Sequence, residues 1–211
     1  MAKLTMTTFV TLDGVMQAPG APDEDRSGGF PHGGWLVPFA DADMGKFMTE
    51  VFANADAFLL GRRTYEIFAA YWPRITDPND RIAHALNTLP KYVASKTLNG
   101  VTWTRSRLVR DVGGELQALK QEHAREIQVH GSGGLAQTLI QHGLVDEYHL
   151  LSFPVVLGAG KRLFAPGTVP TAFERVNTRT TSTGVSINKY RPTGRPQYGS
   201  FALDDAAGGS R

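Results

Sequence analysis

The feature that most constrains the fold is an alternation of apolar runs with stretches of helical spacing. Residues 3–12 alternate apolar and polar side chains and are rich in Thr and Val, which is typical of a strand, whereas apolar residues between 44 and 52 recur at helical spacing. Strands that alternate with helices predict an α/β domain with a mixed, mostly parallel sheet flanked by helices, to which the closing strands add an antiparallel portion. The expected strands are residues 3–12, 57–60, 91–95, 101–104, 127–130, 146–153, 172–180 and 185–191, and the expected helices are residues 44–52, 64–72, 80–89, 112–125 and a segment that opens at 131–134 and stops at 143.

Composition narrows the class of protein. The length of 211 residues favours one domain over two, and a hydrophobic content of 41% is enough for a core. The 22 basic and 20 acidic residues nearly balance, so we expect no nucleic-acid and no membrane partner. Cysteine is absent, which excludes disulfide frameworks, thiolate zinc sites and cysteine nucleophiles. No apolar stretch approaches the ~20 residues of a membrane span, and we expect a cytoplasmic protein.

Two segments lack the alternating pattern. Residues 13–38 are rich in Gly, Pro and Asp, and a loop of this length inside a domain is usually functional or mobile. We interpret it as a lid or a substrate-facing wall, with a disordered surface insertion as the alternative. From Pro192 onward the sequence turns to Gly, Pro, Ser and Asp. We therefore expect a domain over residues 1–191 and a poorly ordered tail over residues 192–211.

The run GSGGLA at residues 131–136 satisfies the pattern G-x-G-x-x-A between an expected strand and an expected helix. Glycines there allow a backbone to approach a pyrophosphate, while the helix N-terminus offers unpaired N–H groups and a partial positive charge. The acidic residue expected about twenty positions further on is absent, because Leu150, Leu151 and Ser152 occupy that neighbourhood. A glycine-rich tight turn is the alternative interpretation.

Two further junctions carry cations beside hydroxyl groups. The run GRRT at residues 61–64 joins an expected strand to an expected helix, and the run SKT at residues 95–97 follows the next strand. The helix dipole disfavours two arginines at a helix start unless an anion binds them, although solvated surface arginines are the alternative. Three such junctions at the carboxyl ends of strands are what a phosphate-rich dinucleotide requires in an α/β crevice.

Other kinds of site have little support in the sequence. The six histidines form no metal-binding pair on a helix, so we predict no metal, and a P-loop and a serine-hydrolase elbow are both absent. Four acids lie near the expected crevice and any of them could donate a proton or orient a substrate, although helix capping explains Asp41 and Asp43 equally well. The other two are Asp13 and Glu66. We select Asp13 and Asp41 as candidate catalytic residues.

Taken together, these residues resemble the dihydrofolate-reductase-like superfamily, and above all the reductase (C-terminal) domain of riboflavin biosynthesis proteins and its stand-alone relatives. The resemblance covers residues 1–191 and rests on TLDG at 11–14, on GRRTYE at 61–66 and on the glycine run at 131–134. It also rests on SKT at 95–97 and on the specific run from LVDE at 144–147 through PVVLGAGKRLF at 154–164.

The resemblance implies a dihydrofolate-reductase-like fold that binds NADPH and forms a homodimer. It places the 2′-phosphate region at the Gly-Arg-x-Thr and Ser-Lys junctions and the pyrophosphate at the glycine pair. In riboflavin reductases an acidic residue precedes that pair, whereas this chain has Ser132. The expected cofactor-binding residues are Gly61, Arg62, Arg63, Thr64, Ser95, Lys96, Gly131, Ser132, Gly133 and Gly134.

The function predicted from this resemblance is an NADPH-dependent reductase that passes a hydride to a small heterocycle, pyrimidine-like or pterin-like, or to a related imine or carbonyl compound. It is similar to 5-amino-6-(5-phosphoribosylamino)uracil reductase. The alternatives are a non-catalytic NADP-binding module and a flavin-binding module on the same fold. The substrate itself does not follow from the sequence.

Overall fold

One sheet organises the chain, and the computed structural model describes it over residues 1–201. Its strands are β1 (Lys3–Thr11), β2 (Ala55–Gly61), β3 (Lys91–Ala94), β4 (Ser106–Val109), β5 (Glu126–His130), β6 (Glu147–Phe153), β7 (Ala172–Thr180) and β8 (Ser186–Gly194). The α-helices of residues 1–201 are α1 (Ala42–Ala53), α2 (Arg62–Tyr71), α3 (Arg81–Thr88), α4 (Val112–Glu122) and α5 (Gly133–Gln141).

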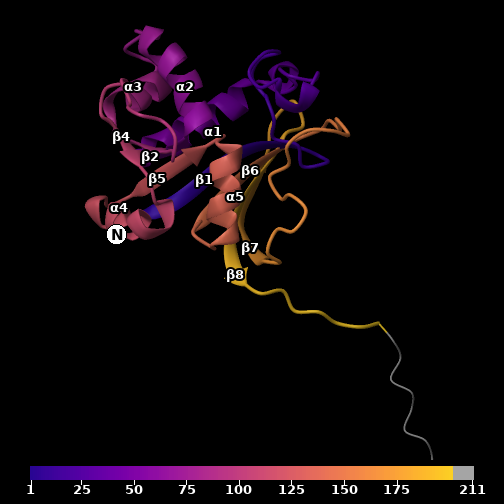
Figure 1. Ribbon diagram of the computed structural model, residues 1–211. Coiled ribbons are helices and arrows are strands. Elements are labelled where there is room, and N and C mark those ends of the chain that lie inside the picture. The colour runs from indigo at the N-terminus through magenta and orange to yellow at the C-terminus, as the bar shows by residue number, and fades with distance from the viewer. Residues whose placement is uncertain (202–211) are drawn as a thin grey trace, which may run out of the picture.

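The strand order is β4-β3-β2-β5-β1-β6-β8-β7 (Figure 1). The first six strands in this order pair in parallel, and β8 and β7 continue the sheet with antiparallel pairing. Parallel strands need crossover connections. Helices lie in the connections from β1 to β2, β2 to β3, β4 to β5 and β5 to β6, whereas the connection from β3 to β4 contains none. The prediction of a mixed, mostly parallel sheet flanked by helices is therefore confirmed.

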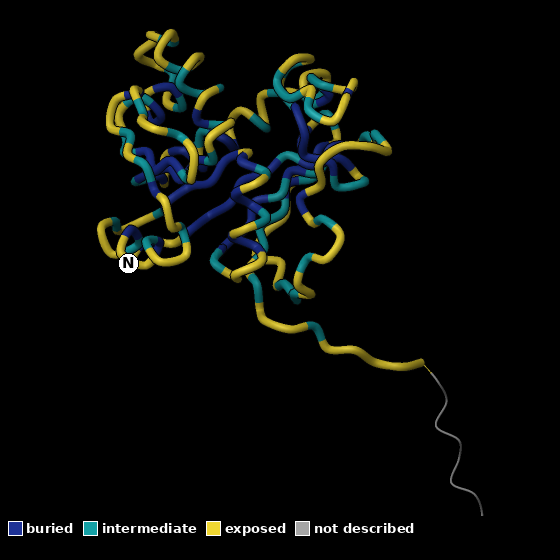
Figure 2. The backbone as a smooth tube through the Cα atoms, viewed as in Figure 1, coloured by how far each residue is buried: buried dark blue, intermediate teal, exposed yellow. Residues whose placement is uncertain are grey.

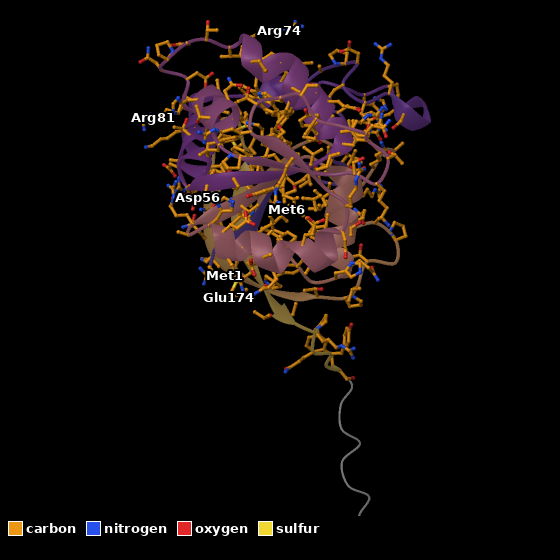
Figure 3. All side chains as sticks on the ribbon, turned by 60° about the vertical axis from the view of Figure 1, so that its left-hand side comes forward. Met1, Met6, Asp56, Arg74, Arg81 and Glu174 are labelled. Carbon is orange, nitrogen blue, oxygen red and sulfur yellow. The ribbon has the colours of Figure 1, made fainter. Side chains whose placement is uncertain are left out.

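Hydrophobic side chains divide between the two faces of the sheet with a period of two. Leu59 of β2 joins the cluster under α4 and α5, whereas its neighbours Phe58 and Leu60 join the cluster that holds α1 and α3. Both faces are covered, so the central parallel strands are largely buried, as Figure 2 shows for the centre of the molecule. In Figure 3 Met6 lies in this interior, while Arg74 and Arg81 lie at the periphery.

A row of polar side chains lies on the α1 side of the buried sheet. The side-chain N–H of Gln128 donates to the backbone carbonyl of Val51 in α1 (2.7 Å). The side-chain oxygen of Gln128 lies 3.1 Å from Nε2 of His130. The ring of Phe52 stacks on His130 at 4.6 Å, and His149 on β6 contacts Glu147 at 3.1 Å. Burial, helped by the charge of His149, lowers the pKa of His130 to about 3, so this ring is neutral inside the protein.

Some expected boundaries were wrong. The segment 101–104 is not a strand, because the N–H groups of Thr102 and Trp103 donate to the hydroxyl of Tyr65, and pairing with β3 begins only at Ser106. The last strand continues to Gly194, where it pairs with β7, so residues 192–194 are not part of a tail. Residues 195–201 continue away from the sheet (Figure 1), and the rest of the expected tail lies outside the described residues.

None of the helices within residues 1–201 is long and apolar enough to cross a bilayer.

Candidate functional site

A cleft of about 750 Å³ opens at the carboxyl ends of the parallel strands. Gly61, Ala94 and Val109 are the last residues of β2, β3 and β4, and all three line it. The turn after β5 and the residues that follow β1 complete its walls. Open α/β sheets bind their ligands at this edge, and the volume is in the range of small-molecule sites.

The turn between β5 and α5 is held to the junction between β2 and α2. The Ser132 hydroxyl accepts from the N–H of Gly61 (3.0 Å) and donates to the carbonyl of His130 (2.9 Å), and the N–H of Ser132 donates to the hydroxyl of Thr64 (2.9 Å). The turn requires left-handed backbone at Gly131 (φ 54°) and Ser132 (φ 58°). A Cβ at Gly131 would also lie only 3.3 Å from the Thr64 hydroxyl, so glycine suits this position.

The first turn of α5 is open toward the cleft. Gly133 and Gly134 are the first residues of the helix, and their N–H groups precede the first intrahelical hydrogen bonds. No atom lies within 4 Å of where a Cβ of Gly134 would be, and this glycine is exposed. The helix dipole adds a partial positive charge here, so the turn can hold an anion.

Cations line the neighbouring part of the cleft. Arg62 donates to Glu66 (2.7 Å) and to the Thr97 hydroxyl (3.2 Å), which connects α2 with the loop after β3. Lys96 in that loop is exposed, and its ammonium group has no hydrogen-bond or ion-pair partner within residues 1–201. Arg110 donates to the carbonyls of Ser95 (2.7 Å) and Leu98 (2.6 Å) and so fixes the loop that carries Lys96.

The long segment before α1 forms a wall of the cleft and is held by Gln17. The Gln17 amide donates to the carbonyls of Asp25 and Ser27 (both 3.0 Å) and accepts from the N–H of Lys161 (3.0 Å). The Trp35 indole donates to the Gln17 carbonyl (2.8 Å), and Gln17 is only 4% exposed. This ordered wall differs from a disordered insertion, and the substrate-facing role of the segment stays a prediction.

Two acids of this segment line the cleft. Burial alone would raise the pKa of Asp25, but hydrogen bonds from Lys161 and Ser27 outweigh it and hold the pKa at about 2. Burial raises the pKa of Glu24, and one of its carboxylate oxygens accepts from the N–H of Gly20 (2.7 Å). Of these two acids, Glu24 is therefore the one that protonates more readily.

The two candidate catalytic acids lie elsewhere. Asp13 accepts from the Thr11 hydroxyl (2.6 Å) and from the N–H of Gly158 (2.9 Å), so it organises a turn and is not part of the cleft lining. Asp41 caps α1 by accepting from the N–H of Met44 (2.8 Å), and its other oxygen binds Thr183 in the turn before β8. The structure does not bring either carboxylate to the cleft, because turn and cap donors occupy both.

All ten expected cofactor-binding residues line the cleft, although ligand binding by them stays a prediction. Five further residues that line the cleft were not predicted from the sequence: Gln17, Glu24, Asp25, Arg110 and Lys161. The first three lie in the long loop, where no periodicity indicates which side chains face inward. Lys161 lies within the run that supports the family resemblance, but that resemblance assigns it no role.

The fold and the cleft define an α/β domain of the reductase-like class. The family model described as the RibD C-terminal domain matches residues 2–187, and the chain belongs to this family. The resemblance inferred from the sequence is thereby confirmed.

Individual relatives agree with this assignment. The chain is 30% identical over 185 residues to YyaP of Bacillus subtilis (strain 168), an uncharacterized protein, and the match covers 87% of this chain and 91% of YyaP. A Shewanella sp. PV-4 structure named for riboflavin biosynthesis has a TM-score of 0.68 at 19% identity and covers 90% of this chain and 98% of its own.

A second solved structure is of a protein named for two activities. The Thermotoga maritima diaminohydroxyphosphoribosylaminopyrimidine deaminase/5-amino-6-(5-phosphoribosylamino)uracil reductase has a TM-score of 0.61 at 15% identity. The match covers 90% of this chain and 56% of that longer chain. At these identities the two solved structures show the fold alone.

Proposed function

We propose that this protein is an NADPH-dependent reductase that acts on a small heterocycle, pyrimidine-like or pterin-like, or on a related imine or carbonyl compound. The observation that carries the proposal is one cleft in which the open first turn of α5 faces the cationic loop after β3. Membership of the RibD C-terminal domain family supports the same reaction class, and so does the likeness to a protein named as a deaminase and uracil reductase.

The residues present fit a dinucleotide diphosphate. The N–H groups at the start of α5 would hold the pyrophosphate, and the open space at Gly134 admits a close approach of its oxygens. When bound, NADPH supplies the hydride, and the protein supplies orientation and electrostatics.

The 2′-phosphate of NADPH needs cationic donors beside the loop after β3. Lys96 is exposed and has no partner within the described residues, and Arg62 reaches the same loop through Thr97. Arg63 was expected to share this role, but its guanidinium binds Asp25 in the long segment before α1, on the opposite wall of the cleft from Lys96. We therefore assign the 2′-phosphate to Lys96 and Arg62.

The wall formed by the long segment before α1 supplies groups for the substrate. Met16 and Ala18 present apolar surface from the long loop, and Glu24 presents a carboxyl group whose pKa is raised by burial. A carboxyl group of raised pKa holds a proton closer to neutral pH and can deliver it to a substrate atom that becomes basic on reduction. We propose Glu24 for this role in place of Asp13 and Asp41.

The proposal predicts that NADPH binds more tightly than NADH. A charge-assisted hydrogen bond contributes about 1.5–3 kcal/mol, so Lys96→Ala should weaken NADPH by about 10–150-fold. Arg62→Ala should act in the same direction, and NADH affinity should change little because NADH lacks the 2′-phosphate. Calorimetric titrations at one fixed salt concentration give the ratio, since exposed phosphate contacts are screened.

The matched control is Arg81→Ala, because Arg81 is an exposed cation on α3 outside the cleft. It should leave both affinities unchanged. A wild-type protein without NADPH preference, or a preference that both cleft variants retain, would contradict the assignment. Absorbance of the purified protein in the flavin bands would favour the flavin-binding alternative, and NADPH binding without reduction of any pyrimidine or pterin would favour the non-catalytic one.

A further inference from the structure

The loop between β3 and β4 is held at two places and is free between them. Arg110 donates to the carbonyl of Leu98 at 2.6 Å, and further along the loop the Tyr65 hydroxyl accepts from the N–H of Thr102 at 2.9 Å. The Asn-Gly pair at residues 99–100 lies between these contacts. Neither its backbone nor its side chain forms a hydrogen bond within residues 1–201. This short stretch therefore depends on no internal contact for its conformation.

Asn99 differs from the other asparagines of the chain in the residue that follows it. The chain has six asparagines, and only Asn99 precedes a glycine. Asn99 and Gly100 are both exposed, and no atom lies within 4 Å of where a Cβ of Gly100 would be. Because Gly100 has no side chain, nothing hinders the approach of its backbone nitrogen to the side chain of Asn99.

This arrangement permits an intramolecular reaction that needs only water. After hydroxide removes the proton of the Gly100 N–H, the nitrogen attacks the side-chain carbonyl carbon of Asn99. A new C–N bond closes a five-membered succinimide ring, the bond to the side-chain nitrogen breaks, and that nitrogen takes up a proton from water and leaves as ammonia. Water then opens the ring at either carbonyl and leaves an aspartate or an isoaspartate at position 99. Proximity favours such a ring closure when neither reacting group is held by another contact.

The product would place a carboxylate in the loop that carries Lys96. The ammonium group of Lys96 has no partner within the described residues, and it is the cation that we assign to the 2′-phosphate. A carboxylate three residues away competes for this ammonium group and repels a bound phosphate. Like charges about 10 Å apart in water lower the affinity for a phosphate dianion by about three- to fourfold.

We propose that Asn99 is a modification site, which deamidates in the folded protein, and that the carboxylate so formed weakens the binding of NADPH but not of NADH. The effect on NADPH rests on the proposed function, whereas the modification itself does not. The preference for NADPH should therefore decline as the protein ages.

Peptide mapping tests the modification without any cofactor. The folded full-length chain is incubated in mildly alkaline buffer and digested with trypsin at intervals, and a sample taken at the start corrects for deamidation during digestion. Asn99 lies in the tryptic peptide 97–105, and Asn79, which is also exposed, lies in the peptide 75–81. The side chain of Asn79 donates to Asp77 at 3.2 Å, so Asn79 serves as the internal control. Mass spectrometry should show the carboxyl form of peptide 97–105 accumulating as separate aspartate and isoaspartate species, while peptide 75–81 stays unchanged.

Gly100→Ala is the matched variant for the ring closure. The added methyl group meets no protein atom, so the fold should be kept, but it hinders the attacking nitrogen and should slow the deamidation strongly. A synthetic peptide of residues 97–105 gives the rate without the fold, and the folded wild type should react at a similar rate. The inference is overturned if the synthetic peptide reacts while the folded protein stays unmodified, or if Gly100→Ala deamidates as fast as the wild type.

Calorimetric titrations of two variants test the consequence. Asn99→Asp carries the charge of one product and should bind NADPH about three- to fourfold more weakly than the wild type, with NADH affinity unchanged. Asn99→Gln is neutral and should match the wild type for both. Higher salt should reduce the difference, because the repulsion acts through solvent. Equal NADPH affinities of Asn99→Asp and Asn99→Gln would overturn the effect on binding. A wild type without NADPH preference would instead contradict the proposed function, and the mapping result would still decide whether Asn99 is modified.

Discussion

Ser132 shows at the scale of one residue why the cleft keeps its shape. Its N–H donates to Thr64 and its hydroxyl donates to the carbonyl of His130, while the hydroxyl also accepts from the N–H of Gly61. Ser132 therefore stabilises the turn and has no proton to donate to a ligand. The riboflavin reductases are expected to have an acid at this position. The reaction that we propose therefore takes its acid from elsewhere, and within the described residues Glu24 in the long loop lines the cleft with a pKa raised by burial.

Gly134 allows folding and binding to be separated. A methyl group there meets no protein atom, so Gly134→Ala should raise the free energy of unfolding by up to about 1 kcal/mol through helix propensity. The same methyl group would occupy the space that we assign to the pyrophosphate, so NADPH affinity should fall by about tenfold or more. Urea unfolding and calorimetric titration measure the two effects.

The control for this variant is Gly45→Ala in α1. Gly45 is also exposed, helical and without atoms near its missing Cβ, but it lies outside the cleft. It should raise stability similarly and leave NADPH affinity unchanged. Unchanged NADPH affinity in Gly134→Ala would show that the start of α5 does not contact the ligand.

At the scale of elements, periodicity predicted most of the strands and helices because both faces of the sheet are buried and each element carries a clear apolar pattern. It failed at residues 101–104, where apolar residues alternate but a tyrosine hydroxyl, distant in sequence, takes the N–H groups. Periodicity did not predict the path of the long loop. The Gln17 side chain holds this loop and accepts from the N–H of Lys161, more than a hundred residues later.

The packing of α1 on the sheet makes stability depend on pH. His130 is buried under Phe52 with a pKa of about 3, whereas a histidine in an unfolded chain has a pKa near 6.5. Because the folded-state pKa is the lower one, the contribution is fully present above about pH 6.5 and is lost as the pH falls toward 3. Between pH 7 and pH 5 the free energy of unfolding should therefore fall by about 2 kcal/mol on account of His130.

Urea unfolding at the two pH values checks this. His130→Gln should remove about 2 kcal/mol of the difference between pH 7 and pH 5, while His84→Gln, at an exposed position of α3, should not. An equal pH dependence in wild type and His130→Gln would mean that the pKa of His130 is the same in the folded and the unfolded protein.

At the scale of the whole molecule, the cleft results from strand order. The glycine and cation junctions were visible in the sequence because each follows a strand, and the parallel sheet brings their ends to one edge. The side chains that close the opposite wall were not predictable. Asp25 and Lys161 are far apart in sequence, and their contact depends on the folded path of two loops.

A crystal structure of the wild-type protein with NADPH would locate each part of the cofactor. We expect the pyrophosphate against the N–H groups of Gly133 and Gly134, the 2′-phosphate beside Lys96, and the nicotinamide toward the wall that carries Glu24. A dinucleotide bound outside this cleft, or one whose 2′-phosphate contacts neither Lys96 nor Arg62, would contradict this assignment.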